Sequence, residues 1–219
     1  MLDPYEFNTR AYGTSRCGTD DPRFPVVLEM IGHDRDILDL GCLDGTVGSL
    51  FIERGNRVTG VDASRSAIET ARSRGLDARL GNLEEPLPFE DNSFDVVFAG
   101  EVIEHVFDVD RMVSEARRVL RAGGSFVVTT PNLAALGRRL MLLFNRNPHI
   151  EISFTGDAAG HIRYFIRSTL AALLQKYGLH IERFASDVVN FNAAGTWRSL
   201  RLARFCPTLG KTLIMQARK

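Results

Sequence analysis

Residues 37–46 read ILDLGCLDGT, an apolar run that ends in a turn with two glycines. The first four residues suit a buried strand, and the apolar spacing that follows Thr46 is that of a helix. Gly41 and Gly45 would let the backbone approach a ligand closely. The stretch therefore predicts a strand, a ligand-binding turn and the start of a helix.

The same alternation of strand and helix continues along the chain. Apolar runs predict further strands at 57–61, 78–80, 94–99, 125–130, 180–186 and 212–218. Apolar spacing predicts further helices at 26–31, 64–74, 110–120, 133–144 and 168–177. Gly123 and Gly124 are expected to end the helix at 110–120. Such an alternation implies a parallel sheet covered on both faces, with its ligand beyond the carboxyl ends of the strands.

Bulk properties narrow the class of protein. With 219 residues, of which 44% are hydrophobic and 25% charged, the chain fits one globular domain. The 27 Lys and Arg residues balance 27 Asp and Glu residues, so net charge gives no sign of a nucleic-acid partner. Three widely spaced cysteines without a CxxC pair predict a reducing compartment, the cytoplasm. We expect neither a signal peptide nor a transmembrane segment, because no apolar run approaches the ~20 residues of a membrane helix.

Two acidic residues distinguish the glycine turn from a dinucleotide site. The glycine spacing is GxxxG rather than GxGxxG, and Asp39 lies inside the preceding strand. A carboxylate there suits an ammonium group better than a pyrophosphate. Asp62 ends the next strand, where an acid accepts hydrogen bonds from ribose hydroxyls.

Two later motifs follow the glycine turn: Gly81-Asn82-Leu83, and the string LPFEDNSFDVVFAGEVIEHV at 87–106. Together these motifs resemble the class I S-adenosylmethionine-dependent methyltransferases. Among these, the pattern is most similar to the methyltransferase type 11 and ubiquinone-pathway O-methyltransferases. The resemblance implies a Rossmann-like α/β fold, with a seven-stranded, mostly parallel sheet, helices on both faces, an antiparallel last strand and a small cap insertion. It also implies a cofactor site made of Asp39, Gly41, Cys42, Gly45, Asp62, Ala63, Asn82, Leu83 and Gly100.

Roles within that site follow from the same resemblance. Asp39 and Gly41 would hold the methionine end of S-adenosylmethionine, and Asp62 the ribose. Asn82 would meet the adenine amino group. The family often has Asp at that position, and a third glycine where this chain has Leu43. We therefore expect the Leu43 side chain to point away from the cofactor, or the turn to differ.

The residues after the fourth strand carry the candidate chemistry. Glu101, Glu104 and His105 form a Glu-x-x-Glu-His pattern like that of the ubiquinone-pathway and small-RNA 2′-O-methyltransferases. In those families the pattern binds a divalent cation, and some members add a later His, here His161. The resemblance thus implies catalytic residues Glu101, Glu104 and His105 and a Mg²⁺-type site completed by His161. In the alternative interpretation His105 is a base or hydrogen-bonds at a helix start, without a metal.

A single domain is expected over 1–219. Its parts are an N-terminal cap and helix (1–35), a cofactor-binding core (36–131), a lid that covers the acceptor (132–165), and a C-terminal helix and strands (166–219). The basic, leucine-rich stretch 136–144 has two interpretations: a cap or membrane-interfacial segment, or a helix packed on the core with outward arginines. The second is the simpler expectation, and the stretch from Trp197 to Arg204 admits the same two.

The function expected from these residues is O-methylation of a small molecule. A hydroxyl on a quinone precursor, an apolar or lipid-linked compound, or a sugar would serve as acceptor. The alternatives are an RNA 2′-hydroxyl, a non-catalytic S-adenosylmethionine-binding partner or regulator, and a nicotinamide oxidoreductase. The expected location is the cytoplasm, including the membrane surface. Oligomeric state does not follow from the sequence.

Overall fold

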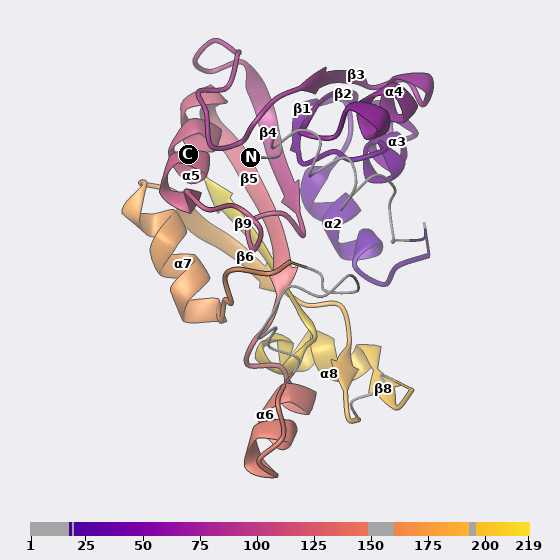
Figure 1. The fold of residues 1–219 in the computed structure, drawn as a ribbon, viewed down its shortest axis with the longest axis vertical. Helices are drawn as coiled ribbons and strands as arrows, with labels where there is room; N and C mark the ends of the chain where they lie inside the picture. The colour runs from indigo at the N-terminus through magenta and orange to yellow at the C-terminus, as the bar shows by residue number, and fades with distance from the viewer. Residues whose placement is uncertain (1–17, 19, 149–159, 193–195) are drawn as a thin grey trace, which may run out of the picture.

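The computed structural model describes residues 18, 20–148, 160–192 and 196–219 (Figure 1). Seven strands form one sheet in the order β3-β2-β1-β4-β5-β9-β6. They are β1 (Asp36–Leu40), β2 (Arg57–Asp62), β3 (Asp77–Leu80), β4 (Phe94–Gly100), β5 (Leu120–Pro131), β6 (His180–Ala185) and β9 (Thr212–Arg218). The neighbouring pairs from β3 to β5 are parallel, whereas β9 runs antiparallel to β5 and β6. The predicted Rossmann-like architecture with an antiparallel last strand is confirmed.

Helices cover both faces of this sheet (Figure 1). Apolar residues of α2 (Phe24–Ile31), α3 (Thr46–Ile52) and α4 (Arg65–Ser73) pack on one face. Those of α5 (Val109–Val119) and α7 (Arg167–Lys176) pack on the other face. Because both faces are buried, the central strands are apolar along nearly their whole length.

The link between α5 and β5 differs from the expected one. The helix ends at Val119, and β5 begins directly at Leu120 rather than near residue 125. Gly123 and Gly124 lie inside the strand, where the pairing with β4 shifts register between Phe94 and Val96. The glycine pair therefore forms an irregularity in a longer strand, because glycine tolerates the left-handed conformation that Gly123 adopts (φ 75°).

A small lobe projects beyond the carboxyl ends of the strands (Figure 1). It contains α6 (Leu136–Leu143), a two-stranded ribbon of β7 (Val189–Asn190) and β8 (Arg198–Ser199), α8 (Leu200–Phe205) and the 3₁₀ turn η1 (Pro207–Leu209). We call its described residues, 133–148, 188–192 and 196–211, the distal lobe. None of the residues of α6 is buried, so the expectation that this stretch packs on the core is wrong.

Two other expectations bear on this region. Residues 149–159 of the expected lid lie outside the described residues. Residues 1–17 of the expected N-terminal cap also lie outside them. Within the described part of the chain, no helix combines the length and the apolar character required to cross a membrane.

Candidate active site

A cavity of about 690 Å³ opens where the carboxyl ends of β1, β2 and β4 meet the loops that follow them. The residues predicted from sequence that line it are Asp39, Gly41, Cys42, Asp62, Ala63, Asn82, Leu83, Gly100, Glu101 and His105. Its walls also include Leu43, Thr129 and Arg23, the last of which directly precedes α2. The sheet thus brings together side chains from four separate loops.

The two glycines of the turn have different roles. Gly41 has a φ of 74°, and a Cβ there would lie 2.3 Å from Val102 Cγ2, so only glycine fits. Gly45 is not among the cavity-lining residues; a Cβ at this position would lie 2.9 Å from the Ala71 backbone, in α4. The Cys42 thiol packs against Gly60 in the core, and Cys42 is also among the residues that line the cavity.

Asp39 is the buried carboxylate of the site. Its side chain is 2% exposed, and Oδ2 has no hydrogen-bond partner among the described residues. Burial, and secondarily the charge of Asp62, raise the pKa of Asp39 to about 7. An unpartnered carboxylate oxygen at a cavity wall fits a cationic ligand, because a cation would compensate its lost hydration.

Asp62 orders the turn from the neighbouring strand. Its Oδ2 accepts a hydrogen bond from the Leu43 backbone N–H at 2.9 Å, and its Oδ1 accepts one from Ser64 N–H at 2.8 Å. Burial raises the pKa of Asp62, and these backbone donors oppose the shift. Leu43 adopts a φ of 47°, so the turn keeps a left-handed residue here without glycine. Leu43 is among the residues that line the cavity.

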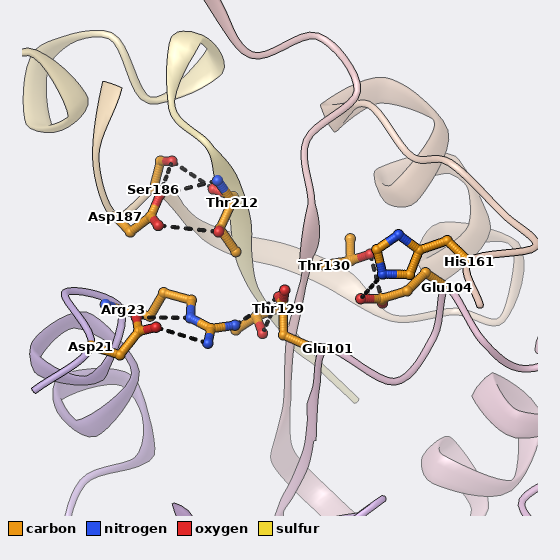
Figure 2. Close-up of polar contacts among 10 residues, drawn as sticks. All are labelled: Asp21, Arg23, Glu101, Glu104, Thr129, Thr130, His161, Ser186, Asp187 and Thr212. Atoms are coloured by element: carbon orange, nitrogen blue, oxygen red, sulfur yellow. Dashed lines mark hydrogen bonds and ion pairs between the residues drawn. The ribbon is translucent and has the colours of Figure 1, made fainter. Parts of the chain in front are cut away.

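Glu101 faces the α2 side of the cavity. Its Oε1 lies 3.0 Å from Nη1 of Arg23 and accepts a hydrogen bond of 3.0 Å from Thr129 Oγ1 (Figure 2). Arg23 also pairs with Asp21. The Glu101 backbone is left-handed, with φ 56°, a conformation that the surrounding contacts must hold for a non-glycine residue.

Glu104 lies on the other side of β5 from Glu101 (Figure 2). It is 1% exposed, its Oε2 accepts a hydrogen bond of 2.8 Å from Thr130 Oγ1, and its Oε1 lies 3.9 Å from His161 Nε2. Burial, and secondarily the charge of Glu101, raise the pKa of Glu104 to about 8. The Glu104 carbonyl accepts hydrogen bonds from the N–H groups of Ile162 and Arg163, which fixes His161 nearby.

His105 completes a group of possible metal ligands. One ligand atom from each of Glu104, His105 and His161 can be chosen so that all three lie within 4.8 Å of one another. His105 Nδ1 lies 3.2 Å from the Gly160 carbonyl oxygen. A carbonyl can only accept, so Nδ1 carries the proton, and Nε2 of the neutral ring carries the lone pair.

Strand geometry explains why the two glutamates separate. Successive side chains on a strand point to opposite faces, and Thr129 and Thr130 are successive residues of β5. Thr129 donates to Glu101 and Thr130 to Glu104. The structure therefore gathers three of the four predicted metal ligands, while Glu101 pairs with Arg23.

Two features were missed in the sequence. Arg23 follows a stretch without regular periodicity, and nothing in a single sequence connects it to Glu101 across 78 positions.

The second feature is that the Asn82 side chain already forms a hydrogen bond, because its Oδ1 accepts one of 3.0 Å from Glu84 N–H. A second lone pair on that oxygen remains for a ligand.

The sheet order and the cavity at its carboxyl edge define an α/β domain of the Rossmann-like class. Residues 38–128 match the family described as "Methyltransferase domain". This segment of the chain is therefore similar to S-adenosylmethionine-dependent methyltransferases.

Individual proteins are similar to part of the chain. A Mycolicibacterium smegmatis protein described as a probable S-adenosylmethionine-dependent methyltransferase is 43% identical over 115 residues, which cover 50% of this chain and 44% of that protein. Human mitochondrial ubiquinone biosynthesis O-methyltransferase is 28% identical over 70% of this chain and 44% of its own length. The chain thus spans less than half the length of these two relatives.

A solved structure shows the same fold. The S-adenosylmethionine-dependent methyltransferase from Mesorhizobium loti superposes with a TM-score of 0.65 at 22% identity, covering 91% of this chain and 99% of that one.

Proposed function

We propose that the chain catalyses transfer of a methyl group from S-adenosylmethionine to a hydroxyl group of a small molecule. The observation that carries this proposal is the cluster of Glu104, His105 and His161 beside the cavity. A hydroxyl needs to lose a proton before it becomes a good nucleophile, and carboxylate and imidazole groups supply that chemistry. The likeness to ubiquinone biosynthesis O-methyltransferases supports the same acceptor class.

The cavity has a suitable group for each part of the donor. Asp39 would pair with the methionine ammonium, and the Arg23 guanidinium is suited to the methionine carboxylate. Asp62 would accept from the ribose hydroxyls, with both oxygens already oriented by backbone donors. Asn82 and Leu83 would meet the adenine.

The transfer is an in-line displacement at the methyl carbon. The acceptor oxygen forms the new C–O bond as the C–S bond breaks, and the bonding pair stays on sulfur to give S-adenosylhomocysteine. The cavity walls would hold the oxygen and the methyl carbon about 3 Å apart and aligned. Without a bound cation, the hydroxyl proton would pass to Nε2 of His105, while the Gly160 carbonyl holds the ring through Nδ1.

We propose further that Glu104, His105 and His161 hold a divalent cation such as Mg²⁺. Oε1 of buried Glu104 fits this group, because it accepts no hydrogen bond from the described residues and lies 3.9 Å from His161 Nε2. When bound, a cation of this kind acts as a Lewis acid that lowers the pKa of the acceptor hydroxyl. His105 would then be a ligand, and solvent would take the hydroxyl proton.

Calorimetry tests both proposals. We expect S-adenosylhomocysteine to bind with micromolar affinity, and Mn²⁺ to bind wild type but about 100-fold or more weakly to Glu104→Gln. Glu69→Gln, on the exposed side of α4, is the matched control. No nucleoside binding would contradict the donor assignment. Nucleoside binding without metal binding would leave His105 as the base.

Turnover on hydroxylated acceptors separates the remaining functions. Transfer to a catechol supports the small-molecule proposal. Transfer only to an RNA 2′-hydroxyl would favour an RNA methyltransferase. Tight cofactor binding with no transfer to any acceptor would favour a non-catalytic binding partner. We expect apolar or lipid-linked acceptors among the substrates, because the cavity wall reaches the distal lobe through Arg198 and Lys211, and that lobe exposes large apolar side chains.

A further inference from the structure

Exposed apolar side chains concentrate on the distal lobe. Nine large hydrophobic residues are exposed in the described part of the chain, and all but Phe107 and Ile162 belong to the lobe. The seven are Leu142, Leu143, Phe144, Phe191, Trp197, Leu200 and Phe205. Three of them form the end of α6 and the residue after it, and two belong to α8. Such a concentration marks an interaction surface rather than scattered surface residues.

The charge of the lobe is as uneven as its hydrophobicity. The whole chain carries 27 basic and 27 acidic residues, yet the described residues of the distal lobe include no Asp or Glu. Its basic residues are Arg138, Arg139, Arg146, Arg198, Arg201, Arg204 and Lys211. A surface of this kind is complementary to an anionic partner.

The two kinds of side chain occur on the same elements. In α8, Ala203 is buried within the lobe. The exposed residues of the helix include Leu200, Arg201, Arg204 and Phe205. Arg139 and Arg146 flank the exposed end of α6. The exposed turns therefore offer apolar side chains with guanidinium groups beside them.

We infer that the distal lobe binds the surface of an anionic lipid bilayer. Leu, Phe and Trp side chains would enter the boundary between headgroups and acyl chains, and the arginines would pair with headgroup phosphates. A second copy of the chain fits poorly, because two acid-free basic surfaces would repel each other. RNA fits less well than lipid, because leucine side chains offer no stacking surface to a base.

This placement bears on the acceptor, a point that rests on the proposed function. Arg198 and Lys211 belong to the lobe and also line the cavity. The lobe projects on the side of the sheet where the cavity opens (Figure 1). A bilayer bound to the lobe would therefore lie next to the cavity mouth, where an apolar acceptor could enter directly.

Vesicle flotation tests the inference without donor or acceptor, so its result is independent of methyl transfer. We expect the protein to float with vesicles of phosphatidylcholine and phosphatidylglycerol (7:3), and much less with phosphatidylcholine alone. Arg201→Gln with Arg204→Gln should weaken binding roughly tenfold or more. Leu143→Ser with Phe144→Ser should weaken it by a similar factor. Added salt should weaken binding by wild type.

Matched controls lie outside the lobe. Phe107 is 73% exposed and Phe144 is 72% exposed, so Phe107→Ser removes as much exposed ring without touching the lobe. Arg54→Gln removes an exposed charge beyond α3. Both variants should float like wild type. The inference would be overturned if Phe107→Ser lost as much vesicle binding as the lobe variants, or if wild type bound neutral vesicles equally well. Binding of a single-stranded RNA without flotation on vesicles would also overturn it.

Discussion

Thr130 donates its hydroxyl proton to Oε2 of Glu104 over 2.8 Å, from a side chain that is fully buried. This bond orients the carboxylate whose other oxygen points toward His161. Thr130→Val keeps the shape and removes the donor. We expect it to weaken Mn²⁺ binding by roughly 10–100-fold, the usual effect of losing a group that orients a metal ligand. Isothermal calorimetry measures this change.

Thr129→Val is the internal control for that experiment. Thr129 donates to Glu101 on the opposite face of β5, so its loss should leave Mn²⁺ affinity within about twofold of wild type. Equal weakening in both variants would mean that Glu101 shares the metal site, as the Glu-x-x-Glu-His pattern had suggested.

The ion pair of Arg23 and Glu101 connects the start of α2 to the end of β4. Both side chains are partly shielded, with 13% and 32% exposure. Arg23→Gln and Glu101→Gln should each lower the free energy of unfolding by about 1–3 kcal/mol, because each removes one of the charges that compensate a shielded group. The double variant should lose less than the sum, with a coupling of about 0.5–2 kcal/mol in urea unfolding. Strict additivity would show that the pair does not form in solution.

Asp39 should make donor binding depend on pH. Its pKa of about 7 in the free protein means that it is largely protonated at pH 6 and ionised at pH 8. A ligand ammonium requires the ionised form, so affinity rises as pH increases through this range, by about tenfold from pH 6 to 8. Calorimetry with S-adenosylhomocysteine at the two pH values measures the effect.

Asp39→Asn supplies the control for this dependence. The variant should bind the nucleoside weakly and with a much flatter pH profile. It should not unfold more readily at pH 8, because it removes a carboxylate whose ionised form is disfavoured by burial. An unchanged pH slope in Asp39→Asn would assign the titration to another group.

Leu43 occupies a left-handed position that a glycine would tolerate better. Leu43→Gly should change the free energy of unfolding by less than about 1 kcal/mol, because relief of strain offsets the added entropy of the unfolded chain. Leu43→Val should lower it by about 1–2 kcal/mol more than Leu43→Gly, because a β-branched side chain is strongly disfavoured at φ 47°. Thermal unfolding of the two variants compares them directly. Equal stability would show that the turn relaxes to another conformation.

The sheet could be predicted from sequence because each of its strands is a short apolar run between helices or turns. The antiparallel entry of β9 came from family resemblance, not from periodicity. The ribbon of β7 and β8 could not be found, since two-residue strands are too short to show an alternating pattern. The exposure of α6 was also hidden, because its leucine content is that of a core helix.

The candidate site was predictable only as a set of loops. Switch-point logic placed Asp39, Asp62 and Glu101 at one edge of the sheet. It could not show that Glu101 and Glu104 separate, because this depends on which threonine of β5 meets each glutamate. Arg23 reaches the site through tertiary packing of α2, which leaves no local pattern in the sequence.

The position of β9 has a consequence during synthesis on the ribosome. Leu213, Ile214 and Met215 are fully buried between β5 and β6, although they are translated after both of these strands. Until they emerge, β5 has an unpaired edge next to apolar side chains, and β6 has no neighbour in the sheet. The nascent chain therefore exposes an aggregation-prone edge of β5 until β9 emerges, which makes it a candidate for protection by a chaperone.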